Sequence, residues 1–200
     1  MKALIFLALL SGLASEVYGE GPVVGAPVND FTLSNLDGSA VNFHLSSGQP
    51  TVVIFFSTHC PMSNAFNYRR NVLYHDFADR VRFIVIDSNA NESLEQIRGY
   101  TRALEFDSPV YKDVNHAVAD RLGARVTTDT FVIDSSGVMR YHGYLEDSPN
   151  PTRSRIQGLR LAIEAVLQGK PVEMPDTKAL GCSIWRLTSA RAAGPGSTPQ

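Results

Sequence analysis

The sequence predicts an α/β fold built around a central sheet. Strand and helix patterns alternate along most of the 200 residues, and this alternation is typical of a sheet covered by helices. The run at 51–56 is an uninterrupted series of apolar, β-branched and aromatic residues, which suits a strand covered on both faces, and residues 81–87 predict a second buried strand. A chain of this length accommodates one domain with a substantial core and short terminal extensions.

The sequence of residues 30–79 predicts a hairpin, a strand and a helix. Residues 30–45 alternate apolar and polar side chains around the turn pair Asp-Gly at 37–38, which indicates the hairpin. The first buried strand follows at 51–56. Residues 61–79 predict one continuous helix, because their apolar residues recur near helical spacing and the proline at 61 suits a first helical turn.

The remaining elements continue the alternation. After the second buried strand, residues 91–104 predict a helix with Asn91 as its cap. The other expected elements are a short strand at 108–113, a short helix at 114–123, an antiparallel strand pair at 128–134 and 138–143, and a last helix at 154–169. Gly123 suits the end of the helix at 114–123.

The two ends of the chain read as extensions of the domain. Residues 1–19 predict a secretory signal peptide, with Lys2 before a short apolar run and Gly19 as a small residue at the cleavage point. An uncleaved membrane anchor is the alternative, although the run is too short to cross a bilayer comfortably. We therefore expect a periplasmic or secreted protein without stable membrane insertion after cleavage. Residues 187–200 are small, polar and Gly/Pro-rich, which predicts a disordered tail.

The composition excludes some classes of partner. The chain is 44% hydrophobic and 19% charged, with a formal net charge of -2, so no nucleic-acid partner is expected. No motif calls for a metal, nucleotide or flavin cofactor, and the histidines show no close metal-ligand spacing. An exported protein meets conditions in which disulfides persist, which gives weight to its two cysteines.

Cys60 is the candidate catalytic thiol. It lies between the strand at 51–56 and the helix expected from Pro61, and a helix N-terminus favours a thiolate. A thiolate attacks a disulfide sulfur or a peroxide oxygen. The hydroxyls of Ser57 and Thr58 can donate to a thiolate or to a bound peroxide, and His59 can add a nearby positive charge. The alternatives are a buried cysteine that packs as a small apolar side chain and a passive, exposed histidine.

Cys182 is the only other thiol in the chain. Serine at position 63 removes the second thiol of a Cys-x-x-Cys motif, so any resolving thiol within the chain must be Cys182. The extended connection at 169–176 can return over the domain, and Gly181 allows a close backbone approach. Three states stay open for the two cysteines: a redox-active pair, a static bridge, or two separate thiols.

The sequence resembles a known group of redox proteins. The Cys-Pro pair at a helix start resembles the thioredoxin-fold superfamily. Residues 25–45, 124–143 and 177–186 resemble segments of peroxiredoxin-like redoxins, a subgroup of the alkyl hydroperoxide reductase/thiol-specific antioxidant (AhpC/TSA) family. The resemblance implies a thioredoxin-like fold with a central mixed sheet flanked by helices and an N-terminal hairpin. It places the redoxin domain at 24–170 and a C-terminal extension with Cys182 at 171–186.

The resemblance also implies an activity. Cys60 would reduce a hydroperoxide and become a sulfenic acid, Cys182 would condense with it, and an external thiol donor would restore both cysteines. Ser57 keeps a hydroxyl at a peroxiredoxin threonine position, and Arg125 is the nearest candidate for the arginine beside the thiolate. Thr128 stands where thioredoxin-like oxidoreductases have a cis-proline.

Two other functions stay open. The first is thiol–disulfide exchange with protein disulfides and no peroxide. The second is a non-enzymatic copper-binding protein that uses cysteine and histidine, for which a second nearby cysteine is missing.

Overall fold

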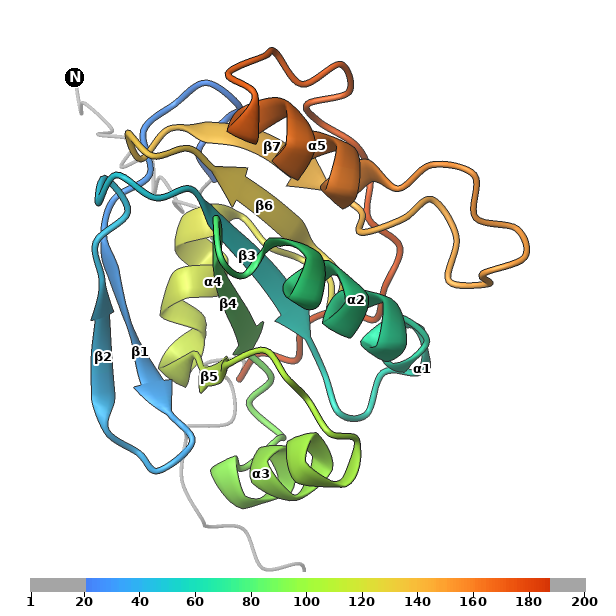
Figure 1. The fold of residues 1–200 in the computed structure, drawn as a ribbon. Coiled ribbons are helices and arrows are strands. Elements are labelled where there is room, and N and C mark those ends of the chain that lie inside the picture. Colours follow the sequence, from blue (N-terminus) through green and yellow to red (C-terminus); the bar gives the residue numbers. More distant parts are fainter. Residues whose placement is uncertain (1–20, 188–200) are drawn as a thin grey trace, which may run out of the picture.

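The computed structural model describes residues 21–187 and confirms the α/β class, with one seven-stranded mixed sheet and helices on both faces (Figure 1). The predicted signal peptide and the tail beyond Leu187 lie outside the described residues. The strand order is β2-β1-β5-β4-β3-β6-β7. The elements are β1 (Phe31–Asn35), β2 (Ala40–Phe43), β3 (Thr51–Phe56), α1 (Pro61–Asn64), α2 (Asn67–Phe77), β4 (Arg82–Asp87), α3 (Leu94–Ala103), β5 (Val110–Lys112), η1 (Val114–His116), α4 (Ala117–Leu122), β6 (Thr130–Ile133), β7 (Met139–Gly143) and α5 (Gly158–Leu167).

The centre of the sheet is parallel and its edges are antiparallel. β3 and β5 both pair in parallel with β4, whereas β6, β7 and the β1–β2 hairpin run antiparallel to their neighbours. Every residue of β3 is buried, as its apolar sequence predicts. The last residues of the two central strands, Phe56 and Asp87, lie opposite each other. The segments that follow β3 and β4 therefore leave the sheet side by side.

Two apolar clusters fill the space on either side of the sheet. One joins α4 to side chains of β3, β4 and β6 that include Phe55, Ile86 and Phe131. The other joins α2, α3 and α5 to the alternate side chains of the same strands. Ile184, from the C-terminal extension, is 5% exposed and belongs to the α4 side. The extension is thus part of the packed domain.

Four expected helices differ from the sequence prediction. The one expected at 114–123 opens as the 3₁₀ turn η1, with positive φ at Asn115 and His116, so the α-helix α4 begins only at Ala117. The helix expected at 61–79 is two helices, because α1 closes with a tight turn in which the Phe66 N–H donates to the Ser63 carbonyl. Ser93 rather than Asn91 caps α3, in a capping box with Gln96. The last helix begins only at Gly158. Residues 154–156 instead donate three hydrogen bonds to the Asp147 carboxylate.

Within residues 21–187, no helix is both long enough and apolar enough to cross a membrane.

Candidate active site

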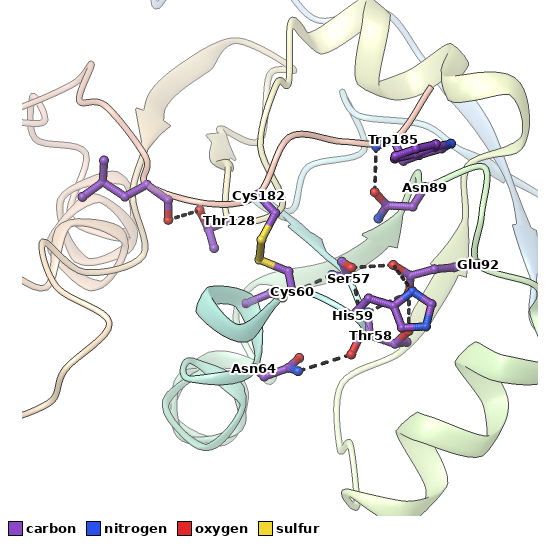
Figure 2. The surroundings of a disulfide bond; sticks show 12 residues. Ser57, Thr58, His59, Cys60, Asn64, Asn89, Glu92, Thr128, Cys182 and Trp185 are labelled. Atoms are coloured by element: carbon purple, nitrogen blue, oxygen red, sulfur yellow. Dashed lines mark hydrogen bonds and ion pairs between the residues drawn. A yellow bond between two sulfur atoms is a disulfide. The ribbon is translucent and has the colours of Figure 1, made fainter. Parts of the chain in front are cut away.

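Cys60 and Cys182 form a disulfide across 122 residues of sequence, with α-carbons 5.9 Å apart (Figure 2). The two cysteine residues differ in exposure: Cys60 is 2% exposed, whereas Cys182 is partly exposed. The structure therefore rules out two separate thiols in this state. That the pair is redox-active remains a prediction.

Cys60 lies at the junction of β3 and α1, as the sequence predicts. It precedes Pro61 with extended backbone angles and makes no side-chain capping bond. The helix that it precedes has only four residues, because the expected long helix breaks before α2. The helix dipole at Cys60 is accordingly weaker than a continuous helix at 61–79 would have provided.

The turn before Cys60 is tied to the helices beside it. The Ser57 N–H donates to the Ser63 hydroxyl at 3.2 Å, so the residue that replaces the second thiol holds the turn. The Asn64 amide donates to the Thr58 carbonyl at 3.2 Å, and the Tyr100 hydroxyl donates to Asn64 at 2.6 Å. This segment is fixed by side chains of α1 and α3.

Glu92 is the main hydrogen-bond acceptor for this turn, and the sequence analysis missed it. Its carboxylate accepts from the Ser57 hydroxyl, the Thr58 hydroxyl and the Thr58 N–H, the last at 2.7 Å. Since each hydroxyl has one hydrogen, neither donates to Cys60 in this oxidised state. His59 is half-exposed, with Nδ1 3.8 Å from Glu92 Oε1. The only sequence signal for Glu92 is an acidic residue beside a helix cap, which usually faces solvent.

Asp87 lies next to Glu92 at the end of β4 and is fully buried. Its Oδ1 accepts from Lys112 Nζ at 2.7 Å and from the Asn89 N–H at 2.9 Å. Burial, followed by a hydrogen bond with Glu92, raises the pKa of Asp87 to about 8. Burial also acts to raise the pKa of Glu92, but hydrogen bonds from Asp87, Ser57 and Thr58 outweigh it and lower that pKa.

Cys182 is carried by a strap, residues 180–185, that pairs with the segment before β6. The Cys182 carbonyl accepts from the Thr127 N–H, and the Ile184 N–H donates to the Arg125 carbonyl, both at 2.9 Å. The Thr128 hydroxyl donates to the Leu180 carbonyl at 2.9 Å. Thr128, at the expected cis-proline position, therefore binds the strap, and the described residues contain no cis peptide bond.

Gly181 allows the close approach that the sequence predicts. A Cβ atom at this position would lie 2.7 Å from the Thr128 hydroxyl oxygen, which is too close for a side chain. Glycine is therefore needed where the strap crosses Thr128.

The Arg125 backbone pairs with the strap, but no described contact joins the Arg125 side chain to either cysteine. Arg125 is exposed and lines a surface pocket of about 550 Å³ between residues 21–24 and 176–179. Neither cysteine lines this pocket. A role for Arg125 beside the Cys60 thiolate stays a prediction. Residues 21–187 also contain no group of three or more His, Cys, Asp or Glu side chains that could hold a metal ion.

Comparisons with known proteins agree with this fold. The AhpC/TSA family model matches residues 24–142. A hypothetical protein from Sinorhizobium meliloti 1021 is 26% identical, with a TM-score of 0.76 and coverage of 85% of this chain and 98% of that chain. An uncharacterized conserved protein from Geobacillus kaustophilus is 28% identical, with a TM-score of 0.76 and coverage of 84% and 94%.

A more distant structure supports the fold alone. A secreted Mycobacterium tuberculosis disulfide oxidoreductase is 18% identical, with a TM-score of 0.54 and coverage of 68% of this chain and 95% of that chain. No curated protein matches the chain. The fold is thioredoxin-like, as the sequence resemblance implies.

Proposed function

The chain belongs to the AhpC/TSA family of redoxins, and from that premise we propose that it is a thiol–disulfide oxidoreductase in which Cys60 and Cys182 exchange with the cysteines of other proteins. One observation supports the proposal: the disulfide joins a nearly buried cysteine residue to a partly exposed one. An approaching thiol meets Cys182 first, and Cys60 is the sulfur that leaves.

The complete exchange transfers two electrons and two protons from a donor dithiol to the Cys60–Cys182 disulfide. A thiolate of the donor attacks the Cys182 sulfur, a mixed disulfide forms, and the bond to Cys60 breaks with both electrons on Cys60. The second donor thiol, as thiolate, then attacks the donor sulfur of the mixed disulfide. The donor leaves with its own disulfide, and Cys60 and Cys182 become thiols by taking up the two protons that the donor released. The reverse sequence oxidises a dithiol.

Hydroperoxide reduction is the second candidate, and family membership favours it. In that reaction the Cys60 thiolate attacks the peroxide and becomes a sulfenic acid while an alcohol or water leaves. Cys182 then condenses with the sulfenic acid and releases water. The contacts favour exchange instead, because the hydroxyls of Ser57 and Thr58 donate to Glu92 and Arg125 lines a pocket without either cysteine.

Two assays on the same proteins separate these functions. One measures insulin reduction with a thiol donor, and the other follows peroxide consumption by the pre-reduced protein in stopped flow. We expect insulin reduction that is lost in Cys60→Ser and in Cys182→Ser and kept in the neighbouring control Ser183→Ala. Rapid peroxide consumption that survives in Cys182→Ser, together with no insulin reduction, would instead assign the peroxidase function.

We also propose that the protein works in the periplasm or outside the cell, with an external thiol donor as its partner. The support is the signal-peptide pattern at residues 1–19. N-terminal mass spectrometry of the protein from its native host should find a mature start near Glu20. A soluble protein that retains Met1 would contradict export by cleavage.

A further inference from the structure

One loop, residues 88–92 between β4 and α3, contacts the chain on both sides of the disulfide (Figure 2). At one end Glu92 binds the turn that leads into Cys60. At the other end Asn89 and Ala90 bind Trp185, three residues after Cys182. The loop thus spans the two segments that the disulfide joins.

The contact at the Cys60 end is a buried charge with several donors. The Glu92 side chain is 1% exposed, and its two oxygens accept from two hydroxyls and one N–H of Ser57 and Thr58. Hydrogen bonds to an ionised acceptor are stronger than those between neutral groups. Because all three donors lie within three residues of Cys60, Glu92 fixes the backbone that carries this sulfur.

The contact at the Cys182 end uses the backbone of the strap. The Trp185 N–H donates to Asn89 Oδ1, and the Trp185 carbonyl accepts from the Ala90 N–H, both at 2.9 Å. The adjacent Ile184 is buried in the α4-side cluster. None of these contacts uses the sulfur atoms, so opening the S–S bond removes no donor or acceptor from them.

We propose that loop 88–92 is a clamp that keeps the Cys60 and Cys182 segments within bonding reach after the disulfide opens, with Glu92 as the positioning residue on the Cys60 side. The inference rests on the proposed function for its biological use, but its physical content concerns only the two thiols. A clamp of this kind raises the effective concentration of each thiol at the other, so the disulfide closes readily. The Glu92 charge also opposes ionisation of Cys60.

The clamp is tested by the equilibrium between the protein disulfide and dithiothreitol at pH 7. The proteins are the wild type, Glu92→Gln, Asn89→Ala and the control Glu95→Gln, which removes an exposed carboxylate one turn away. We expect the equilibrium constant for disulfide closure to fall about tenfold in Glu92→Gln and in Asn89→Ala, which is about 30 mV for a two-electron couple. Glu95→Gln should match the wild type.

A second readout separates the two ends of the clamp. The pKa of Cys60 is measured by alkylation rate in the Cys182→Ser background. Glu92→Gln should lower it by about half a unit or more, because a nearby negative charge is lost. Asn89→Ala should leave it unchanged. The other titratable groups around Glu92 are Asp87, Lys112, His59 and Tyr100, and all are retained in both variants.

The outcomes decide between the inferences. A closure constant within twofold of the wild type in both variants overturns the clamp, and if Glu92→Gln does not fold, Asn89→Ala decides alone. An equal Cys60 pKa in Glu92→Gln and the wild type overturns the claim that the Glu92 charge opposes ionisation of Cys60. A shifted closure constant in a protein that neither reduces nor oxidises protein cysteines keeps the clamp and rejects the proposed function.

Discussion

The two cysteines lie in segments that are held by different kinds of contact. The Cys60 turn is buried and fixed by side chains, chiefly Glu92, Ser63 and Asn64. The Cys182 strap is partly exposed and is fixed largely through its backbone, with Ile184 as its apolar anchor. The comparison shows that backbone pairing of a peripheral segment positions the second cysteine, whereas polar side chains at the C-terminal ends of the central strands position the first.

Opening the bond between the two segments should have the largest effect on stability. A crosslink across 122 residues is worth about 4–5 kcal/mol in the chain-entropy model, because it restricts the unfolded chain. Denaturant unfolding with and without a reductant measures this difference. The Cys60→Ser/Cys182→Ser double variant should show no response to the reductant. Equal stability of oxidised and reduced wild type would mean that the bond does not constrain the unfolded chain.

Removing the apolar anchor should be the next largest effect and should act on the strap. Ile184→Ala should lower the free energy of unfolding by about 2–4 kcal/mol, because it empties a buried site. Leu180→Ala is the matched control on the same strap, since Leu180 is 54% exposed and should change stability little. Similar losses in the two variants would show that the strap is not anchored at Ile184.

The buried carboxyl on the Cys60 side should give stability a pH dependence. The pKa of Asp87 is about 8 in the folded protein, against about 4 in an unfolded chain. Between these values the folded protein binds more protons, so stability falls as pH rises, by up to about 1.4 kcal/mol per pH unit. Asp87→Asn should flatten this slope in urea unfolding from pH 5 to 8.

Asp79→Asn is the control for this slope, because its side chain is 76% exposed. It should keep the wild-type slope. A wild-type slope in Asp87→Asn would show that Asp87 does not hold its proton in the folded state.

The smallest effect should come from the single side-chain hydrogen bond between the strap and Thr128. Thr128→Val should lower stability by about 1 kcal/mol, because the Leu180 carbonyl loses its donor. Thr128→Ser keeps the hydroxyl and should lose less. A greater loss in Thr128→Ser than in Thr128→Val would indicate that packing of the Thr128 methyl group, rather than the hydrogen bond, matters here.

Much of the fold could be predicted from the sequence, because the signals are local. The apolar runs at 51–56 and 81–87 become the buried strands β3 and β4, and alternation around Asp-Gly becomes the β1–β2 hairpin. Helix ends were predicted less well. Residues 154–156 read as helix, yet their polar groups bind the Asp147 carboxylate, which no local pattern reveals.

The candidate site also has features that the sequence predicts and features that only the tertiary structure shows. The sequence by itself determined the place of Cys60 after a buried strand, the lack of a second thiol at Ser63, and Cys182 as the one other thiol in the chain. Only the tertiary structure decided that Cys182 returns to Cys60 and that Glu92 holds the intervening turn. The disulfide joins residues 122 positions apart, and the Glu92 hydrogen bonds join residues 34 and 35 positions apart. The Glu92 contacts depend on the sheet order that brings the ends of β3 and β4 together. A glutamate is ordinarily exposed, so its burial became visible only once the sheet placed Ser57 and Thr58 against it.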